Sequence, residues 1–211
     1  MILLCLANSY KEGGRCIAGI LLDNNHNPIL KHNSPTWVRP VCEADHGQVP
    51  NHLCQNIQPL DIIEINGTNN VGSGYQSENT SFDENEILSI GKANRNILNN
   101  LHSNTNLIFG NRGKALHEDT IKTLNHSLIL VNLSQFEIDE KQYEGREHPQ
   151  VRLKFSYKNN SYNLPITDPI FLDSYSKNET IINGKNDIDV VLSLGVPYNG
   201  WYYKLVATII H

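Results

Sequence analysis

The chain opens with ILLCLANSYKEGGRCIAGI at residues 2–20 and closes with LSLGVPYNGWYYKLVATII at residues 192–210. Each stretch consists of an apolar run, a polar or glycine-rich segment and a second apolar run, which is the pattern of a β-hairpin. Hairpins at both ends predict two small β-domains side by side. We expect the polar segments of these hairpins to mark where a ligand could bind.

Between the hairpins, short strands and turn residues alternate at intervals of about 10 residues, which is typical of small barrels and sandwiches. Strands are expected at residues 36–41, 61–65, 127–131, 136–138, 151–157 and 161–165. Apolar residues at helical spacing predict a helix over residues 83–101. The fold expected is mainly β, with two small five-stranded barrels in tandem and one or two short helices. Residues 1–105 would form the first barrel with its connecting helix, and residues 106–211 the second.

Composition narrows the possible environments and partners. The 211 residues carry a formal net charge of -5, so any nucleic-acid binding would need a local basic patch. Four cysteines are too few and too unevenly spaced for a disulfide-stapled secreted module, which favours a reducing cytoplasm. No apolar run approaches the roughly 20 residues of a membrane-spanning helix, so no membrane partner is expected.

The first hairpin is predicted to turn over residues 8–14. There Asn8, Ser9 and Lys11, together with two glycines, would let backbone N–H groups approach an anion closely. Arg15 begins the returning strand and adds a positive charge. The alternative is an ordinary solvated hairpin turn.

A second candidate site lies on the expected strand at residues 36–41. Trp37 and Arg39 are two residues apart, so both side chains project from one face of the sheet. An aromatic ring beside a cation is what an OB-type barrel uses to stack a base and hold a phosphate. The alternative places Trp37 in the core and leaves Arg39 solvated at an edge.

The sequence GNRGKAL at residues 110–116 repeats the chemistry of the first turn. Arg112 and Lys114 flank a glycine at the expected start of a helix, whose N-terminus would favour an anion. Here too, the alternative is a solvated turn.

The sequence YQSEN at residues 75–79 supplies Gln76, Glu78 and Asn79. Their amides and carboxylate could hydrogen-bond to a base edge or a ribose. The same side chains could instead close a loop through local bonds to the backbone.

Aromatic residues gather near the C-terminus, with lysines between them. Strand alternation places Trp201 with Tyr203 on one face and Tyr202 with Lys204 on the other. One pair should be core and the other exposed. We expect this hairpin to be mainly structural, with the N-terminal hairpin as the preferred binding surface.

The remaining polar residues include candidate metal ligands. Cys42, His46, His52 and Cys54 have donor types that suit tetrahedral zinc, but their spacing matches no known zinc motif. They are expected to be free thiols and solvated imidazoles. Asp187 and Asp189 share a strand face and could hold Mg²⁺, although such acids are usually solvated. No catalytic residue, metal or cofactor is predicted.

Seven segments occur in order along nearly the whole chain: ANSYKEGGRCIAGI, WVRPV, PLDIIEI, YQSEN, IFGNRGKAL, ITDP and SLGVPYNGWYYKLVATII. Together they resemble a prokaryotic family of dual OB-fold domains associated with bacterial conflict and antiphage defence systems. The resemblance implies two OB-like barrels in a non-catalytic subunit that recognises nucleic acid or a nucleotide-derived ligand. The subunit would signal to an effector protein encoded nearby. The alternatives are a protein-interaction scaffold of a defence complex, or an enzyme that processes nucleotides or nucleic acid.

Overall fold

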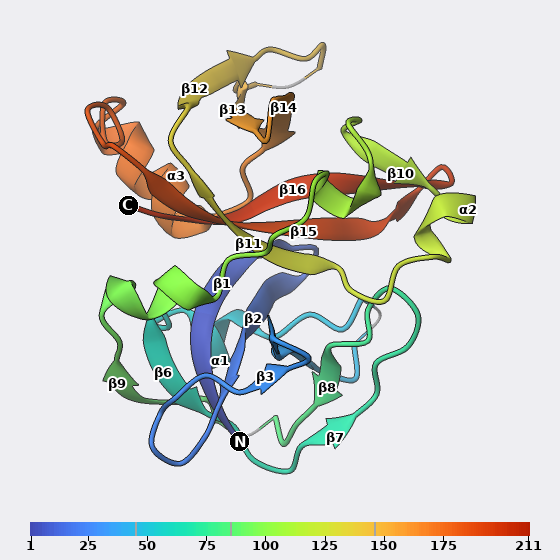
Figure 1. Ribbon diagram of the computed structural model, residues 1–211, viewed down its shortest axis with the longest axis vertical. Helices are drawn as coiled ribbons and strands as arrows, with labels where there is room; N and C mark the ends of the chain where they lie inside the picture. Colours follow the sequence, from blue (N-terminus) through green and yellow to red (C-terminus); the bar gives the residue numbers. More distant parts are fainter. Residues whose placement is uncertain (45, 85, 146) are drawn as a thin grey trace. The chain divides into compact units, whose positions relative to one another are not determined.

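The computed structural model describes residues 1–211 except Asp45, Asn85 and Arg146 (Figure 1). The chain divides into two compact units, Met1–Leu101 (unit 1) and His102–His211 (unit 2). The boundary expected from the sequence lay between residues 105 and 106. Among the described residues, no helix is long and apolar enough to cross a membrane.

Unit 1 is built around one curled sheet. Its described residues contribute seven strands in the order β7-β8-β5-β2-β1-β6-β9, antiparallel except for the β5–β8 pair. The bounds are β1 Ile2–Lys11, β2 Gly14–Leu22, β5 Trp37–Val41, β6 Asp61–Glu64, β7 Asn69–Asn70, β8 Asn79–Ser81 and β9 Leu88–Lys92. The smaller elements are the β3–β4 ribbon at Leu30–Lys31 and Ser34–Pro35, helix α1 at Asn51–Cys54 and the 3₁₀ helix η1 at Arg95–Asn100.

The hairpin β1–β2 is the centre of this sheet (Figure 1). Its register shifts between Cys5 and Ala7, which is a β-bulge. Gly19 faces Cys5 there, and a Cβ at Gly19 would lie 2.2 Å from the carbonyl oxygen of Leu4. Glycine is therefore required for the two backbones to approach this closely. The side chains of Leu3, Cys5 and Ile17 join the apolar core of the unit.

Two local predictions for unit 1 are wrong. Residues 83–101 do not form one helix, because Leu88–Lys92 pair with β6 as strand β9 and the helical turn starts only after Asn94. Asn94 caps that turn by accepting from the Asn96 N–H at 2.9 Å. The hairpin turn is also shorter than residues 8–14, because β1 continues to Lys11. Pairing with neighbouring strands overrode the local helix and turn preferences.

Unit 2 has two sheets and a capped helix. Among its described residues, four strands are ordered β10-β16-β15-β11 and three are ordered β12-β13-β14. The bounds are η2 Ile108–Gly110, β10 Ala115–His117, α2 Glu118–Ile121, β11 Leu128–Leu133, β12 Phe136–Lys141, β13 Gln150–Tyr157, β14 Asn160–Pro165, α3 Pro169–Lys177, β15 Ile188–Tyr198 and β16 Trp201–Ile210. Helix α3 begins where Asp168 accepts from the N–H groups of Ile170 and Phe171, at 3.0 Å each.

The prediction of a mainly β fold with OB-like curled sheets and short helices is confirmed. The expected strand number of five in each barrel is wrong, because the described part of unit 1 contains nine strands, seven of them in one sheet, and that of unit 2 contains seven. The additional strands include β7, β8 and β9. They are extended because they pair with neighbouring strands: β7 with β8, β8 with β5 and β9 with β6.

Candidate nucleic-acid interface

Three aromatic side chains form a row across three strands at the turn end of hairpin β15–β16. Tyr198 faces Trp201 across the hairpin, and Trp201 faces His117 on β10. Directly opposed residues of antiparallel strands project from the same face, so the three rings share one surface. The ring centroids of His117 and Trp201 are 5.2 Å apart in an edge-to-face arrangement. Tyr198 is 67% exposed and Trp201 is 44% exposed. We call these three residues the aromatic row.

The sequence folds this way because of the turn between the strands. Asn199 and Gly200 both have positive φ values, 48° and 77°, as a two-residue hairpin turn of type I′ requires. The Gly200 carbonyl accepts from the N–H of Glu118 at 3.1 Å, which holds the start of α2 against the turn. In Figure 1, β10 and α2 lie beside the end of β15–β16 that carries this turn. The row is thus built on paired strands, which fix its geometry.

Charges surround the aromatic row on the chain segments next to it. Arg112 and Lys114 are exposed in the loop before β10, and the Lys114 ammonium lies 6.0 Å from the centre of the Tyr203 ring. Asp119 is a nearby acid, and its pKa is lowered by a hydrogen bond from Lys122 and by His117. Glu118, which directly follows His117, is a second exposed acid, so the segment next to the row carries charges of both signs.

A buried lysine holds the loop that carries these two cations. Lys204 is fully buried, and its ammonium donates to the carbonyl of Ile108 at 2.6 Å and that of Asn111 at 2.8 Å. It also donates to Asn111 Oδ1 at 2.6 Å, and Asn111 Oδ1 accepts from the Gly113 N–H at 3.0 Å. Burial lowers the pKa of Lys204 to about 8. Lys204 therefore fixes the segment that leads to Arg112 and Lys114.

The expected anion site at the start of a helix near residues 110–116 is wrong. These residues form a loop and enter strand β10, and α2 begins only at Glu118. Arg112 and Lys114 nevertheless lie in the segment that precedes His117 of the aromatic row. Their place beside this row comes from the pairing of β10 with β16.

The structure separates the residues expected at the first hairpin. Asn8 and Ser9 are buried within β1, and the Asn8 amide donates to the carbonyls of Cys54 and Ile57, at 2.8 Å each. Lys11 is half-buried at the end of β1, and Arg15 is half-buried on β2. Asn8 therefore holds α1 and the residues after it, while Lys11 and Arg15 reach the surface.

Arg39 is neither exposed nor solvated. It is 3% exposed, and its guanidinium is paired with the Glu78 carboxylate at 3.3 Å. It also donates to Asn79 Oδ1 at 3.4 Å, and Asn79 donates to Gln76 Oε1 at 3.3 Å. These contacts join β5 to β8 and to the loop before it. The side chains of Gln76, Glu78 and Asn79 close that loop in the structure, and Trp37 is half-buried.

The four possible zinc ligands do not converge. Cys42 and Cys54 lie in the apolar core of unit 1, whereas His46 and His52 are exposed. Burial raises the pKa of Cys42 to about 12 and that of Cys54 to about 11, which disfavours the thiolate that zinc requires. Asp187 and Asp189 both accept from the Asn132 amide, at 3.1 and 2.9 Å. Among the described residues, no group of three or more metal-ligating side chains is assembled.

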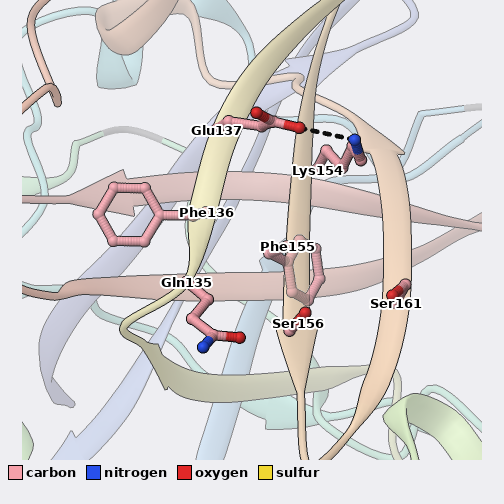
Figure 2. A pocket seen from close by; sticks show the side chains of 7 residues that line it. All are labelled: Gln135, Phe136, Glu137, Lys154, Phe155, Ser156 and Ser161. Atoms are coloured by element: carbon pink, nitrogen blue, oxygen red, sulfur yellow. Dashed lines mark ion pairs between the residues drawn. The ribbon is translucent and has the colours of Figure 1, made fainter.

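A cavity of about 220 Å³ lies on the three-stranded sheet of unit 2 (Figure 2). Figure 2 shows Glu137 on β12 facing Lys154 on β13, and their charged atoms are 2.7 Å apart. Glu137 raises the pKa of Lys154 through this contact. The two charges in the cavity neutralise each other, so it is a weaker candidate for a charged ligand than the aromatic row.

A family model described as Dual OB-containing domain matches residues 1–209. The chain belongs to this family. No curated protein matches the sequence. Among solved structures, a murine DNA-binding protein bound to double-stranded DNA is similar, with 8% identity, a TM-score of 0.33, and coverage of 100% of this chain and 97% of that one. The Ifi202 HINa domain in complex with double-stranded DNA has 13% identity, a TM-score of 0.32 and coverage of 99% and 90%. Similarities with TM-scores this low do not indicate what this chain binds.

Membership of the dual OB-containing family confirms the resemblance seen in the ordered motifs. Sequence reasoning missed Tyr198 and His117 as candidate interface residues and assigned a structural role to Trp201. The Asn199-Gly200 pair is the signal that could have found Tyr198, because such a turn places the residues on either side opposite each other. His117 had no comparable signal, since its contact with Trp201 depends on strand pairing between distant segments.

Proposed function

We propose that this dual OB-containing protein binds single-stranded nucleic acid on the aromatic row of unit 2. The observation that carries the proposal is the exposed alignment of Tyr198, Trp201 and His117 on one sheet face. Bases stack on such rings with little sequence preference, and each stacked base contributes about 1–3 kcal/mol. Arg112 and Lys114 would contact the phosphates that flank the stacked bases.

The proposal is compatible with the net charge of -5. Nonspecific binding that relies on charge alone needs many phosphate contacts. Here stacking would supply most of the affinity, and two local cations would contribute a small dependence on salt. We therefore expect a shallow slope of log affinity against log salt, of about -1 to -2 for two neutralised phosphates on a single strand.

The test measures fluorescence anisotropy of labelled oligo-dT and oligo-U with the full chain over a salt series. Trp201→Ala is expected to weaken binding about tenfold, because one stacking platform is lost. Tyr143→Ala is the matched control, since Tyr143 is also exposed with a lysine, Lys141, 5.1 Å from its ring. Unchanged affinity for both Trp201→Ala and Tyr198→Ala would refute the proposal.

We further propose that binding is used for sensing, in a subunit of a bacterial antiphage defence system that signals to an effector protein encoded nearby. The family membership and the ordered motifs support this role. The experiment is co-purification of the chain with the products of neighbouring genes, with and without oligo-dT. Loss of a bound effector, or gain of its activity, on addition of the oligonucleotide is the expected result.

A further inference from the structure

We propose that unit 1 carries a second, separate binding site, formed by Arg15 and Tyr10 with Lys11 beside them, for the phosphate group of a nucleotide. The site goes beyond the aromatic row and rests on the proposed function only in the choice of a nucleotide as the ligand. The phosphate could belong to a free nucleotide or to a nucleic-acid backbone.

The side chains of Tyr10 and Arg15 face each other across the β1–β2 hairpin. The guanidinium carbon of Arg15 lies 4.6 Å from the centre of the Tyr10 ring, which is a cation–π contact. Tyr10 is nevertheless 56% exposed. The pair therefore offers a flat ring and a planar cation at one point of the surface.

The position of Arg15 is fixed by the surrounding structure. Its backbone N–H and carbonyl both pair with Val49, at 2.9 Å each, and its Nε donates to Asn51 Oδ1 at 3.1 Å. Asn51 is the first residue of α1, and Asn8 holds the end of α1 through the carbonyl of Cys54. A guanidinium fixed in this way loses little conformational entropy when it binds a ligand.

The hydrogen-bonding capacity of Arg15 is largely unused. Among the described residues, only its Nε has a protein acceptor, and Nη1 is buried without one. A buried donor without a partner calls for an acceptor such as water or a bound ion. Phosphate oxygens match the two terminal nitrogens of arginine in geometry and charge.

Lys11 adds a second cation at the same end of the hairpin. Within the described part of the chain, its ammonium has no carboxylate partner. Burial lowers the pKa of Lys11, Cys16 acts in the opposite direction, and the nearby Arg39 lowers it further. The adjacent acid, Glu12, lies 3.5 Å from His46. A bound anion would favour the charged form of Lys11.

The test records amide shifts of the full ¹⁵N-labelled chain during titration with ATP, oligo-dT or inorganic phosphate. The expected result is shifts at residues 10–15 and 49–51 with ATP or with oligo-dT. Shifts with ATP identify a free nucleotide as the source, and shifts with oligo-dT alone identify the backbone. Absence of shifts in this region with both ligands would overturn the inference.

Variants separate this site from the aromatic row. Arg15→Gln is expected to weaken the ligand response of the hairpin about tenfold, and Arg15→Lys to weaken it less, because lysine keeps the charge but loses the planar fork. The double variant Tyr198→Ala/Trp201→Ala should retain the shifts at residues 10–15. Loss of those shifts in the double variant, or their persistence in Arg15→Gln with the fold intact by circular dichroism, would contradict a separate site.

Discussion

The hairpins β1–β2 and β15–β16 have similar sequence patterns but different tips. At β1–β2, the exposed Tyr10 is partly covered by Arg15, and buried Asn8 connects the strand to α1. At β15–β16, Tyr198 and Trp201 are exposed at the end of the hairpin, and Trp201 contacts His117 from β10. The same strand–turn–strand pattern thus yields a cation-centred surface in unit 1 and a stacking surface in unit 2. The neighbouring elements decide which surface forms.

The largest expected effect concerns the buried ion pair of unit 1, in which both side chains are only 3% exposed. Arg39→Ala should lower the free energy of unfolding by about 3–5 kcal/mol, because it leaves the Glu78 carboxylate buried without its partner. Urea denaturation followed by Trp37 fluorescence measures this. The control is Lys177→Ala, which breaks an exposed pair with Asp173 and should cost under about 1 kcal/mol.

The glycines of the two hairpins should also differ. Gly19→Ala should destabilise unit 1 by about 3 kcal/mol, because the new Cβ would lie 2.2 Å from a backbone oxygen. Gly195→Ala on β15 should be nearly neutral, since its Cβ would meet the flexible Leu205 side chain at 3.4 Å. Thermal unfolding of both variants tests the contrast. If both variants lost the same stability, the close approach of the two backbones at Gly19 would not be the cause of the loss.

Lys204 has no equivalent in β1–β2. Lys204→Met should lower the stability of unit 2 by about 1–3 kcal/mol, because the carbonyls of Ile108 and Asn111 lose a buried donor. The variant should also weaken oligonucleotide binding slightly, because the loop with Arg112 and Lys114 is no longer held. Urea denaturation followed by Trp201 fluorescence, together with the anisotropy assay, measures both effects. A variant with normal stability and full affinity would contradict this role.

The smallest effect is an opposite response of the two units to alkaline pH. The pKa of Lys204 is about 8 in the folded chain, below its ordinary value of 10.5, so the unfolded chain binds more protons between these values. The stability of unit 2 should therefore rise with pH over this range. In unit 1, burial raises the pKa of Cys42 and Cys54 to about 12 and 11, above the ordinary value of 9.0. There the folded state binds more protons, and stability should fall as pH rises above about 9.

Urea denaturation at pH 7.5 to 10, followed separately through Trp37 and Trp201, measures both responses. Each unit contains one tryptophan, so single Trp→Phe variants assign the signals. Lys204→Met should remove the gain in unit 2, and Cys54→Ala should reduce the loss in unit 1. The same direction of change in both units would contradict the assignment of these groups.

Local sequence was a good guide to the long strands. The expected strand at 161–165 is Asn160–Pro165, and the expected strand at 151–157 is Gln150–Tyr157. Apolar alternation and turn residues are local signals, so they could be recognised without knowing the partners. The expected helix over residues 83–101 failed because Leu88–Lys92 gain more from pairing with β6 than from a helix interrupted by Gly91.

The candidate interface was less predictable. Arg112 and Lys114 were expected as ligand contacts because they are cations beside glycines. Tyr198 and His117 were missed. Arg39 was expected at the surface and is buried against Glu78. The sequence shows which residues are charged, but it does not show whether a residue from a distant segment will form an ion pair with them.

The β-rich character, the two terminal hairpins and the family of this chain can be recognised from the amino-acid sequence, because strand periodicity, turn residues and motif order are properties of the linear chain. Which polar groups are buried, which rings are exposed and which cations have partners becomes visible only in the folded chain. Burial and ion pairing depend on contacts between residues far apart in the chain, as between Lys204 and Asn111 or Trp201 and His117.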